Sequence, residues 1–209
     1  MKPIETIMRA APVIPVLVID EVAHALPIAR ALVAGGLRVL EVTMRTPAAL
    51  DAIRAMRKVP GAIVGAGTVL NPQDLKAAID AGAEFIVSPG LTPKLGEAAI
   101  AAGIPFLPGT ANAADIMLGL DLGLSHFKFF PAATSGGLPA LKALAAPFHM
   151  AKFCPTGGIN LASAPEWLAA DPVLCVGGSW LVGQIGGNGD TPDESAIEAA
   201  ARDAAALGG

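Results

Sequence analysis

The stretch AAIDAGAEFIVS, residues 77–88, decides the fold, because it joins an alanine-rich segment, one glycine and a short apolar segment. The same pattern recurs along the chain at residues 31–42, 98–109 and 118–130. A glycine directly after a helical segment is typical of a helix end, where it adopts the left-handed conformation that other residues avoid. We therefore expect a helix to end, and a strand to follow, at four glycines: Gly35, Gly82, Gly103 and Gly123.

Extending this pattern over the whole chain predicts eight short apolar strands: residues 13–19, 37–43, 62–67, 85–88, 105–108, 127–130, 151–155 and 173–177. Helical segments fill the intervals, and we expect Asp20 and Asn71 to be the N-caps of the helices after the first and third strands. Strands that are apolar along most of their length are typical of a parallel sheet. Eight strand–helix units predict a compact (β/α)8 barrel, the TIM-barrel architecture, with residues 1–209 as a single domain. An open doubly wound sheet is the alternative.

Additional helices are expected at both ends of the barrel. Residues 3–10 predict an N-terminal helix that closes the bottom of the barrel. Thr191, Pro192 and Glu194 have the spacing of a capping box with proline at the first helical position, which predicts a C-terminal helix to about Leu207. The glycine-rich segment before it, residues 186–189, is expected to be a flexible loop.

The composition excludes several classes of protein. Hydrophobic residues make up 53% of the chain and charged residues 15%, which is the opposite of the balance in a disordered protein. The net charge of −4 argues against a nucleic-acid partner, which requires a basic surface. The longest uncharged stretch, residues 98–114, is interrupted by glycine and proline and is not expected to span a membrane. No secretory signal is visible, and we expect a cytoplasmic protein.

The two cysteines, Cys154 and Cys175, lie in apolar segments and are expected to be buried, reduced thiols. A metal site requires more ligands at closer spacing, so we expect none. The sequence also carries no cofactor signature, and its chemistry is expected to depend on side chains alone.

Two charged residues, Glu41 and Lys128, fall where the predicted strands face inward. Alternation places Glu41 on the face of Val39, and Lys128 on the face of His126. A structural ion pair is one interpretation, because a buried charge requires a partner. Function is the other, because active sites of such barrels lie at the carboxyl ends of the strands. Burial among phenylalanines favours a neutral amine, which forms Schiff bases with carbonyl groups, and a nearby carboxylate can transfer protons. The pair therefore indicates carbonyl chemistry of the aldolase kind.

Glycine pairs follow the last two predicted strands, as Gly157–Gly158 and as Gly177–Gly178 before Ser179. The loops after strands 7 and 8 are the recurrent phosphate site of this barrel, and glycines let backbone N–H groups approach phosphate oxygens. A helix expected to begin near Ser179 would add its positive end. Tight turns without a ligand are the other interpretation.

A second anion site is predicted after strands 2 and 3. The Arg45 guanidinium can hold a carboxylate with two hydrogen bonds, and the Thr68 hydroxyl can support it, unless Arg45 is only a solvated surface charge. His126 lies one layer deeper than Lys128 and is interpreted as structural. His24 and His149 are interpreted as surface or core residues.

Six segments of the chain are similar in sequence to one known family. From about Ile4 to Val182 the chain is similar, in order and at matching spacing, to the bacterial 2-keto-3-deoxy-6-phosphogluconate (KDPG) aldolases, also called 2-dehydro-3-deoxy-phosphogluconate aldolases, a family that also includes 4-hydroxy-2-oxoglutarate (KHG) aldolases. The similar segments are VLEVTMRT (39–46), IVGAGTVLNP (63–72), SPGLT (88–92), FKFFPA (127–132), CPTGGI (154–159) and CVGGSWLV (175–182). The chain departs from the family pattern at residues 109–112 and after Val182.

The resemblance implies a class I aldolase of the Entner–Doudoroff pathway that is a barrel and a homotrimer. It implies that Lys128 is the Schiff-base lysine and Glu41 the acid/base. It further implies substrate-binding roles, with Arg45 and Thr68 on the pyruvyl carboxylate, Pro89 and Phe130 lining the pocket, Thr156 on the sugar chain, and a phosphate site that includes Gly157, Gly158, Gly178 and Ser179.

Several activities remain open. The same scaffold can cleave 4-hydroxy-2-oxoglutarate or the galactonate epimer of the substrate, and the Thr156 hydroxyl favours the gluconate form. A non-catalytic phosphosugar-binding barrel and a phosphosugar isomerase are the alternatives from other classes, and neither requires an imine.

Overall fold

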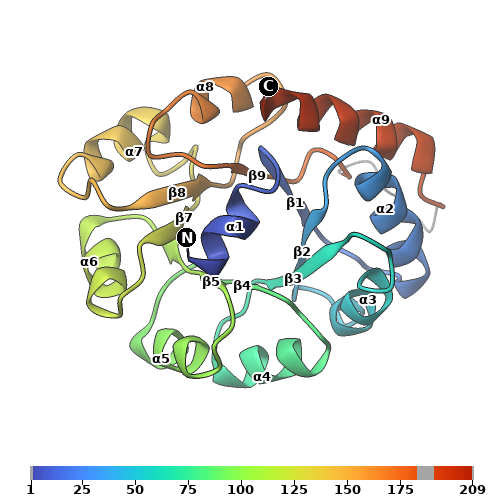
Figure 1. Ribbon diagram of the computed structural model, residues 1–209, viewed down its shortest axis with the longest axis horizontal. Helices are drawn as coiled ribbons and strands as arrows, with labels where there is room; N and C mark the ends of the chain where they lie inside the picture. Colours follow the sequence, from blue (N-terminus) through green and yellow to red (C-terminus); the bar gives the residue numbers. More distant parts are fainter. Residues whose placement is uncertain (1, 183–190, 209) are drawn as a thin grey trace.

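The chain forms an α/β fold in which parallel strands curl around a central axis and most helices lie outside them (Figure 1). The computed structural model describes residues 2–182 and 191–208. One sheet has the strand order β5-β4-β3-β2-β1-β9, and a second has the order β6-β7-β8. The strands are β1 (Val13–Leu17), β2 (Val39–Thr43), β3 (Ile63–Gly67), β4 (Ile86–Val87), β5 (Phe106–Leu107), β6 (Gly109–Thr110), β7 (His126–Phe129), β8 (Lys152–Pro155) and β9 (Val176–Gly178).

The two sheets approach each other at both of their edges. Between β5 and β6 only Pro108 intervenes, and its carbonyl accepts a hydrogen bond from the Lys128 N–H at 2.8 Å. On the other side, isolated parallel bridges join Phe153 to Val173 and Thr156 to Gly177. The prediction of parallel strands that alternate with helices is confirmed, as a curled parallel sheet in two pieces.

Several predicted strand limits are wrong. β1 ends at Leu17 instead of residue 19, and β2 begins at Val39 instead of residue 37. Ile19 and Leu37 are nevertheless buried, so the apolar pattern continues where strand pairing has stopped. The fifth strand does not end at Pro108, because pairing resumes in β6, and the last strand lies at 176–178 instead of 173–177. In this fold, the segment of buried apolar side chains therefore does not begin and end at the same residues as the hydrogen-bonded strand.

The helices form an outer layer around the strands, with one exception at the N-terminus (Figure 1). They are α1 (Pro3–Met8), α2 (Val22–Ala34), α3 (Ala49–Met56), α4 (Pro72–Asp80), α5 (Pro93–Ala101), α6 (Ala113–Asp121), α7 (Gly137–Ala145), α8 (Ala164–Leu168) and α9 (Glu194–Ala205), followed by the 3-10 helix η1 (Ala206–Gly208). The apolar core between the strands and this outer layer includes Phe127, Phe129 and Phe153, all of them buried.

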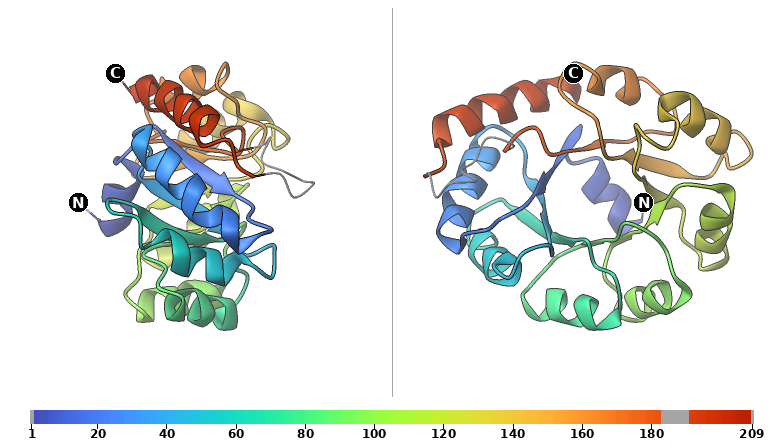
Figure 2. Two further views of the ribbon diagram at one scale, coloured as in Figure 1. Left: turned by 90° about the vertical axis from the view of Figure 1, so that its right-hand side faces the viewer. Right: turned by 180° about the vertical axis from the view of Figure 1, so that it is seen from behind.

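The exception is α1, which lies in the middle of the curled strands in Figure 1 and at one end of them in the side view of Figure 2. Its Ile4, Ile7 and Met8 are buried in a second apolar cluster. That cluster includes side chains of the inner faces of several strands, namely Ile14, Val39, Phe85, Val87, Leu107, Cys154 and Cys175. The N-terminal helix therefore closes the interior at the amino ends of the strands, as predicted.

Helix ends follow the glycine pattern in three of its four positions. Gly82, Gly103 and Gly123 have φ values of +92°, +65° and +76°, as predicted for the residue after a helix. The prediction for Gly35 is wrong, since its φ is −75° and the neighbouring Gly36 has the left-handed conformation. Glycine at position 35 has a different explanation, because a Cβ there would lie 2.5 Å from the Cβ of Ala201 on α9. It permits close packing of the C-terminal helix against α2.

Helix starts are predicted less well. Asn71 caps α4 as expected, with its side chain accepting from the Asp74 N–H at 2.9 Å. Asp20 is not an N-cap, since α2 begins one residue later, after Glu21. Similarly, α9 is capped by Asp193, whose carboxylate accepts from the Ala196 N–H, and not by Thr191. The segment 186–189, predicted to be a flexible loop, lies outside the described residues. Within the described residues, none of the helices has the length and apolar character needed to cross a membrane.

The left-handed glycines offer a test of how the helices end. A Cβ at Gly103 would meet no atom within 4 Å, so Gly103→Ala tests conformation alone. We expect it to lower the free energy of unfolding by about 1–2 kcal/mol, the penalty for a side chain in the left-handed region. The measurement is chemical denaturation.

Gly90→Ala is the matched control, because that position also has open space but no left-handed φ. This variant is expected to be neutral or slightly stabilising. Equal losses for both variants would show that the left-handed conformation is not the reason for glycine at position 103.

Candidate functional site

The predicted pair, Glu41 and Lys128, lies inside the curled strands and is in direct contact. Lys128 Nζ donates a hydrogen bond to Glu41 Oε1 at 3.0 Å, and the two residues are only 5% and 3% exposed. The two residues come from β2 and β7, which are in different sheets and 87 positions apart in the chain. Because both side chains are buried, each charge depends on the other for stabilisation.

Phenylalanines on either side of Lys128 fix its direction. Phe127 and Phe129 point into the outer core, where Phe127 packs on Phe153 and Phe129 on Trp167, with ring centroids 6.0 and 6.5 Å apart. Since side chains alternate along a strand, Lys128 must then face the interior. The lysine Nζ lies 5.3 Å from the centre of the Phe130 ring, which gives the cation an aromatic face as a further partner.

Arg45 and Thr68 are brought together as predicted, each just after the end of its strand. Arg45 Nε donates to Thr68 Oγ1 at 3.3 Å. Thr68 is the non-glycine residue with a left-handed backbone among those described, with a φ of +57°. A β-branched residue in this region is strained by about 1–3 kcal/mol, and such strain is commonly found at functional sites.

The glycine-rich turns after β8 and β9 are neighbours in space, since a bridge joins Thr156 to Gly177. Gly157 and Gly158 have φ values of +104° and +77°, so the turn after β8 requires glycine at both positions. Thr156 is buried, and its Oγ1 donates to the Cys154 carbonyl at 3.4 Å. The two predicted glycine pairs therefore lie side by side at the carboxyl ends of the strands, with Gly177 and Gly178 buried.

The helix expected near Ser179 does not begin within the described residues up to Val182, where a turn at 180–181 follows β9. The next residues, 183–190, lie outside the described part of the chain. The Trp180 ring lies directly against Gly178, where a Cβ would collide with its atoms, so the chain after β9 folds back over the end of its own strand. Ser179 itself is exposed.

Pro89 and Phe130, predicted to line the pocket, are both partly buried at the ends of their strands. The Pro89 carbonyl lies against Gly109, where any side chain would collide with the backbone of residues 89–90. Residues 109–112, where the chain departs from the family pattern, thus contribute a glycine on which the Pro89 turn packs.

Thr43 is an inward-facing residue that was not among those predicted from the sequence. It is fully buried, and its Oγ1 donates to the Leu17 carbonyl at 2.9 Å, which ties β2 to β1 just above the Glu41 layer. The same alternation that selects Val39 and Glu41 selects Thr43, so the signal was present.

His126 belongs to the floor of the interior, as the structural interpretation expects. Its Nε2 lies 3.6 Å from a carboxylate oxygen of Glu5 on α1. Burial lowers the pKa of His126, and the Glu5 charge opposes that change. The ring therefore faces the N-terminal helix rather than the lysine.

Both cysteines are buried free thiols, as predicted. The hydrogen bond between them and their burial raise the pKa of the Cys175 thiol well above its ordinary value. Within residues 2–182 and 191–208, no three His, Cys, Asp or Glu side chains are grouped closely enough to share a metal ion.

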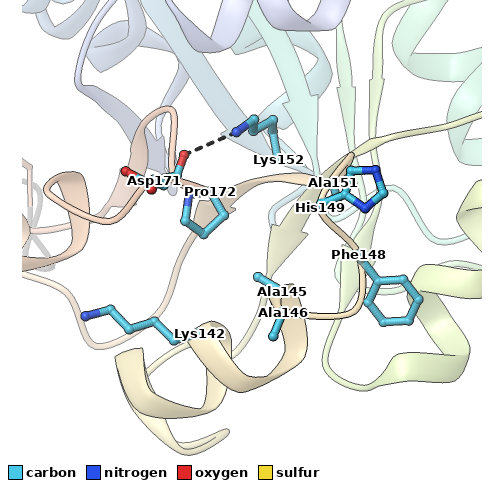
Figure 3. Close-up of a pocket in the computed structure, with 9 residues that line it drawn as sticks. All are labelled: Lys142, Ala145, Ala146, Phe148, His149, Ala151, Lys152, Asp171 and Pro172. Carbon is cyan, nitrogen blue, oxygen red and sulfur yellow. Dashed lines mark hydrogen bonds between the residues drawn. The ribbon is translucent and has the colours of Figure 1, made fainter.

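A separate cavity of about 390 Å³ lies at the opposite ends of the strands, where Lys152 begins β8 (Figure 3). Figure 3 shows Lys142 and Lys152 on its walls, with the Lys152 ammonium donating to the Asp171 backbone carbonyl at 3.3 Å. Lys142 stands in the last turn of α7, where a cation stabilises the helix end. The lysines of this cavity thus have structural roles, and neither Glu41 nor Lys128 is among the residues that line it.

Comparison with known proteins identifies the family of a chain with these site residues. The model of the KDPG and KHG aldolase family matches residues 4–193. The chain belongs to the KDPG and KHG aldolase family. It is 59% identical to the 2-dehydro-3-deoxy-phosphogluconate aldolase of Zymomonas mobilis, over 99% of this chain and 97% of that one. The predicted family is therefore confirmed.

Solved structures agree in fold. A crystal structure of the Zymomonas mobilis ZM4 2-keto-3-deoxy-6-phosphogluconate aldolase with 3-phosphoglycerate has a TM-score of 0.94 at 59% identity, covering 99% of this chain and 97% of that one. A structure of the KDPG aldolase of Legionella pneumophila, with pyruvate captured as a covalent carbinolamine, has a TM-score of 0.89 at 43% identity and covers 97% and 98% of the two chains.

The backbone of Thr68 provides a stability test of the site. Asparagine adopts the left-handed conformation more readily than a β-branched residue. Thr68→Asn is therefore expected to raise the free energy of unfolding by about 1 kcal/mol, measured by chemical denaturation. Thr134→Asn, at an exposed threonine without a left-handed φ, is the control and should change stability by less than about 0.5 kcal/mol. A loss of stability in Thr68→Asn would mean that the contact with Arg45 outweighs the strain.

Proposed function

We propose that this protein is a class I aldolase that cleaves 2-keto-3-deoxy-6-phosphogluconate into pyruvate and glyceraldehyde 3-phosphate, and that it also cleaves 4-hydroxy-2-oxoglutarate. The observation that carries the proposal is the buried contact between Lys128 Nζ and Glu41 Oε1. A lysine and a carboxylate isolated from water are the two groups that imine chemistry requires. Family membership and the names of the relatives support the same reaction.

The first step is attack of the Lys128 amine on the C2 carbonyl of the substrate. A proton passed from Lys128 Nζ to Glu41 Oε1, across 3.0 Å, leaves the uncharged amine that this step needs. Loss of water from the adduct gives a positively charged imine. Cleavage of the C3–C4 bond then sends its electron pair toward the imine nitrogen, while the C4 hydroxyl loses a proton and becomes the aldehyde.

Glu41 is the group that moves protons in this sequence. It returns a proton to the departing water and accepts the proton of the C4 hydroxyl, directly or through a water molecule. It then supplies the proton that converts the enamine at C3 into the methyl group of pyruvate. Hydrolysis of the imine releases pyruvate and restores the lysine, so no oxidant or reductant is consumed.

The two anionic ends of the substrate have separate sites in this proposal. Arg45 and Thr68 hold the carboxylate, and Pro89 and Phe130 enclose the pyruvyl part. Thr156 contacts the C4 and C5 hydroxyl groups. Backbone N–H groups of the two glycine turns and the Ser179 hydroxyl hold the phosphate: these residues are Gly157, Gly158, Gly178 and Ser179. The adjacency of the turns after β8 and β9 supports this arrangement.

A coupled assay that follows pyruvate release tests the proposal directly. Faster cleavage of the gluconate substrate than of its galactonate epimer is expected, because the Thr156 hydroxyl can accept or donate a hydrogen bond. The reverse preference would assign the epimer as substrate. Binding of phosphosugars without pyruvate release would indicate a non-catalytic barrel, and interconversion of sugar phosphates without cleavage an isomerase.

The proposal also covers the closure of the barrel, the oligomeric state and the location of the protein in the cell. We infer that the two sheet pieces form one (β/α)8 barrel, supported by the Pro108 junction, the bridge from Thr156 to Gly177 of β9 and the bridge from Phe153 to Val173 just before β9. We also infer a homotrimer, supported by exposed apolar side chains at Val18, Val22, Leu70 and Met117, and a cytoplasmic location, supported by two free thiols. Native mass spectrometry tests the trimer.

Removal of the carboxylate tests the proton shuttle. Glu41→Gln keeps the shape of the side chain but removes its basic site, and kcat is expected to fall by about 10²–10⁴-fold with little change in KM. Glu97→Gln, which alters an exposed carboxylate on α5, should leave both unchanged. A nearly unchanged kcat in Glu41→Gln would make Glu41 structural.

Loss of the serine hydroxyl tests the phosphate site. A hydrogen bond to a charged group is worth roughly 1.5–3 kcal/mol, so Ser179→Ala should raise KM for the phosphorylated substrate about 10-fold or more at similar kcat. Cleavage of 4-hydroxy-2-oxoglutarate, which has no phosphate, is the internal control and should barely change. Equal losses with both substrates would contradict a phosphate role for this loop.

A further inference from the structure

Two glycines of β3, Gly65 and Gly67, face the interior beside Glu41. β3 is the parallel neighbour of β2, with Glu41 opposite Gly65 and Thr43 opposite Gly67. Neither glycine has a left-handed φ, so the backbone at both positions is open to residues with a side chain. The reason for glycine must therefore lie in what surrounds these positions.

At Gly67 the surroundings are the Glu41 side chain itself. A Cβ built on Gly67 would lie 2.7 Å from Glu41 Cγ and 2.8 Å from its Cδ, and closer still to Oε1. Oε1 is the atom that accepts the hydrogen bond from Lys128. The carboxylate therefore rests directly on the Cα of Gly67 while it contacts the lysine.

The carboxylate has little room to move away from a methyl group at this position. The Phe85 ring occupies the space over Gly65, where three of its atoms would lie 2.5 Å from an added Cβ. Since Gly65 is the residue paired with Glu41, this fully buried ring fills the inner face of β3 next to the carboxylate. A side chain at position 67 must push the carboxylate out of line with Lys128 Nζ.

We infer that Gly67 is a positioning residue for catalysis. Because it has no side chain, the Glu41 carboxylate can lie directly against its Cα, and we call this space the seat of Glu41. This inference rests on the proposed function, in which Glu41 moves protons to and from atoms bonded to or near Lys128 Nζ. Proton transfer requires heavy atoms within hydrogen-bond reach, and an ångström of displacement is enough to impair it.

A double-mutant cycle between Gly67→Ala and Glu41→Ala tests the inference. In the parent, Gly67→Ala is expected to lower kcat at least 10-fold with little change in KM, and to lower the Tm. In the Glu41→Ala background the added methyl group has nothing to displace. There, Gly67→Ala should change neither kcat nor Tm beyond experimental error. Such non-additivity is what a merely structural glycine would not produce.

Gly65→Ala is the matched control, because it places the same methyl group on the same face of the same strand but against Phe85. It should lower the Tm without an equal loss of kcat, and its effect on Tm should persist in the Glu41→Ala background. If Gly67→Ala stays within threefold of the parent kcat, or loses the same factor in both backgrounds, the inference is wrong.

The two proposals fail in different ways. A parent enzyme that releases no pyruvate would overturn the proposed function, and the Tm arm of the cycle would still decide whether Gly67 seats Glu41. An active parent with an additive cycle would overturn only the role of Gly67. If Gly67→Ala alone does not fold, recovery of folding in the double variant supports the seat, and continued failure to fold contradicts it.

Discussion

The contact between Lys128 and Glu41 is the interaction on which the rest of the site depends. Taking two charges out of water costs several kcal/mol per ion, and that cost is recovered only when the geometry of the pair is good. The fold supplies this geometry through rigid neighbours. Phe127 and Phe129 fix the direction of the lysine from outside, and Gly67 leaves room for the carboxylate from inside. The same pair that is expensive for stability is the one that imine chemistry can use.

Missing side chains are as important to this interior as the side chains present. A Cβ at Gly177 would lie 2.8 Å from Thr156 Cγ2 and closer to its hydroxyl, and one at Gly109 would collide with the Pro89 turn. Each of these glycines lies beside a residue of the predicted site. Close approach of the Thr156 side chain to Gly177, and of the Pro89 backbone to Gly109, thus explains glycine in these strands, where it is otherwise unfavourable.

Much of the fold could be predicted from the sequence, because alternation and glycine-terminated helices are local signals. Gly82, Gly103 and Gly123 have the expected left-handed backbone, and alternation placed Lys128 on the face of its strand opposite Phe127 and Phe129, which the structure buries in the outer core. The error at Gly35 has a tertiary cause, since glycine at this position is set by packing on α9, which is distant in the chain. The break of the fifth strand at Pro108, with pairing resumed in β6, likewise depends on the neighbouring strand. The contacts of Gly67 could not be predicted, because an absent side chain leaves no periodic signal.

In the proposed reaction Lys128 forms the covalent bond to the substrate, and chemical trapping tests this role most directly. Borohydride added together with pyruvate should inactivate the protein and leave one reduced adduct, located by peptide mass spectrometry on the segment that contains Lys128. The same treatment without pyruvate should leave activity intact, and activity should persist in EDTA. An adduct on another lysine, or inactivation by EDTA with no adduct, would contradict the covalent role of Lys128.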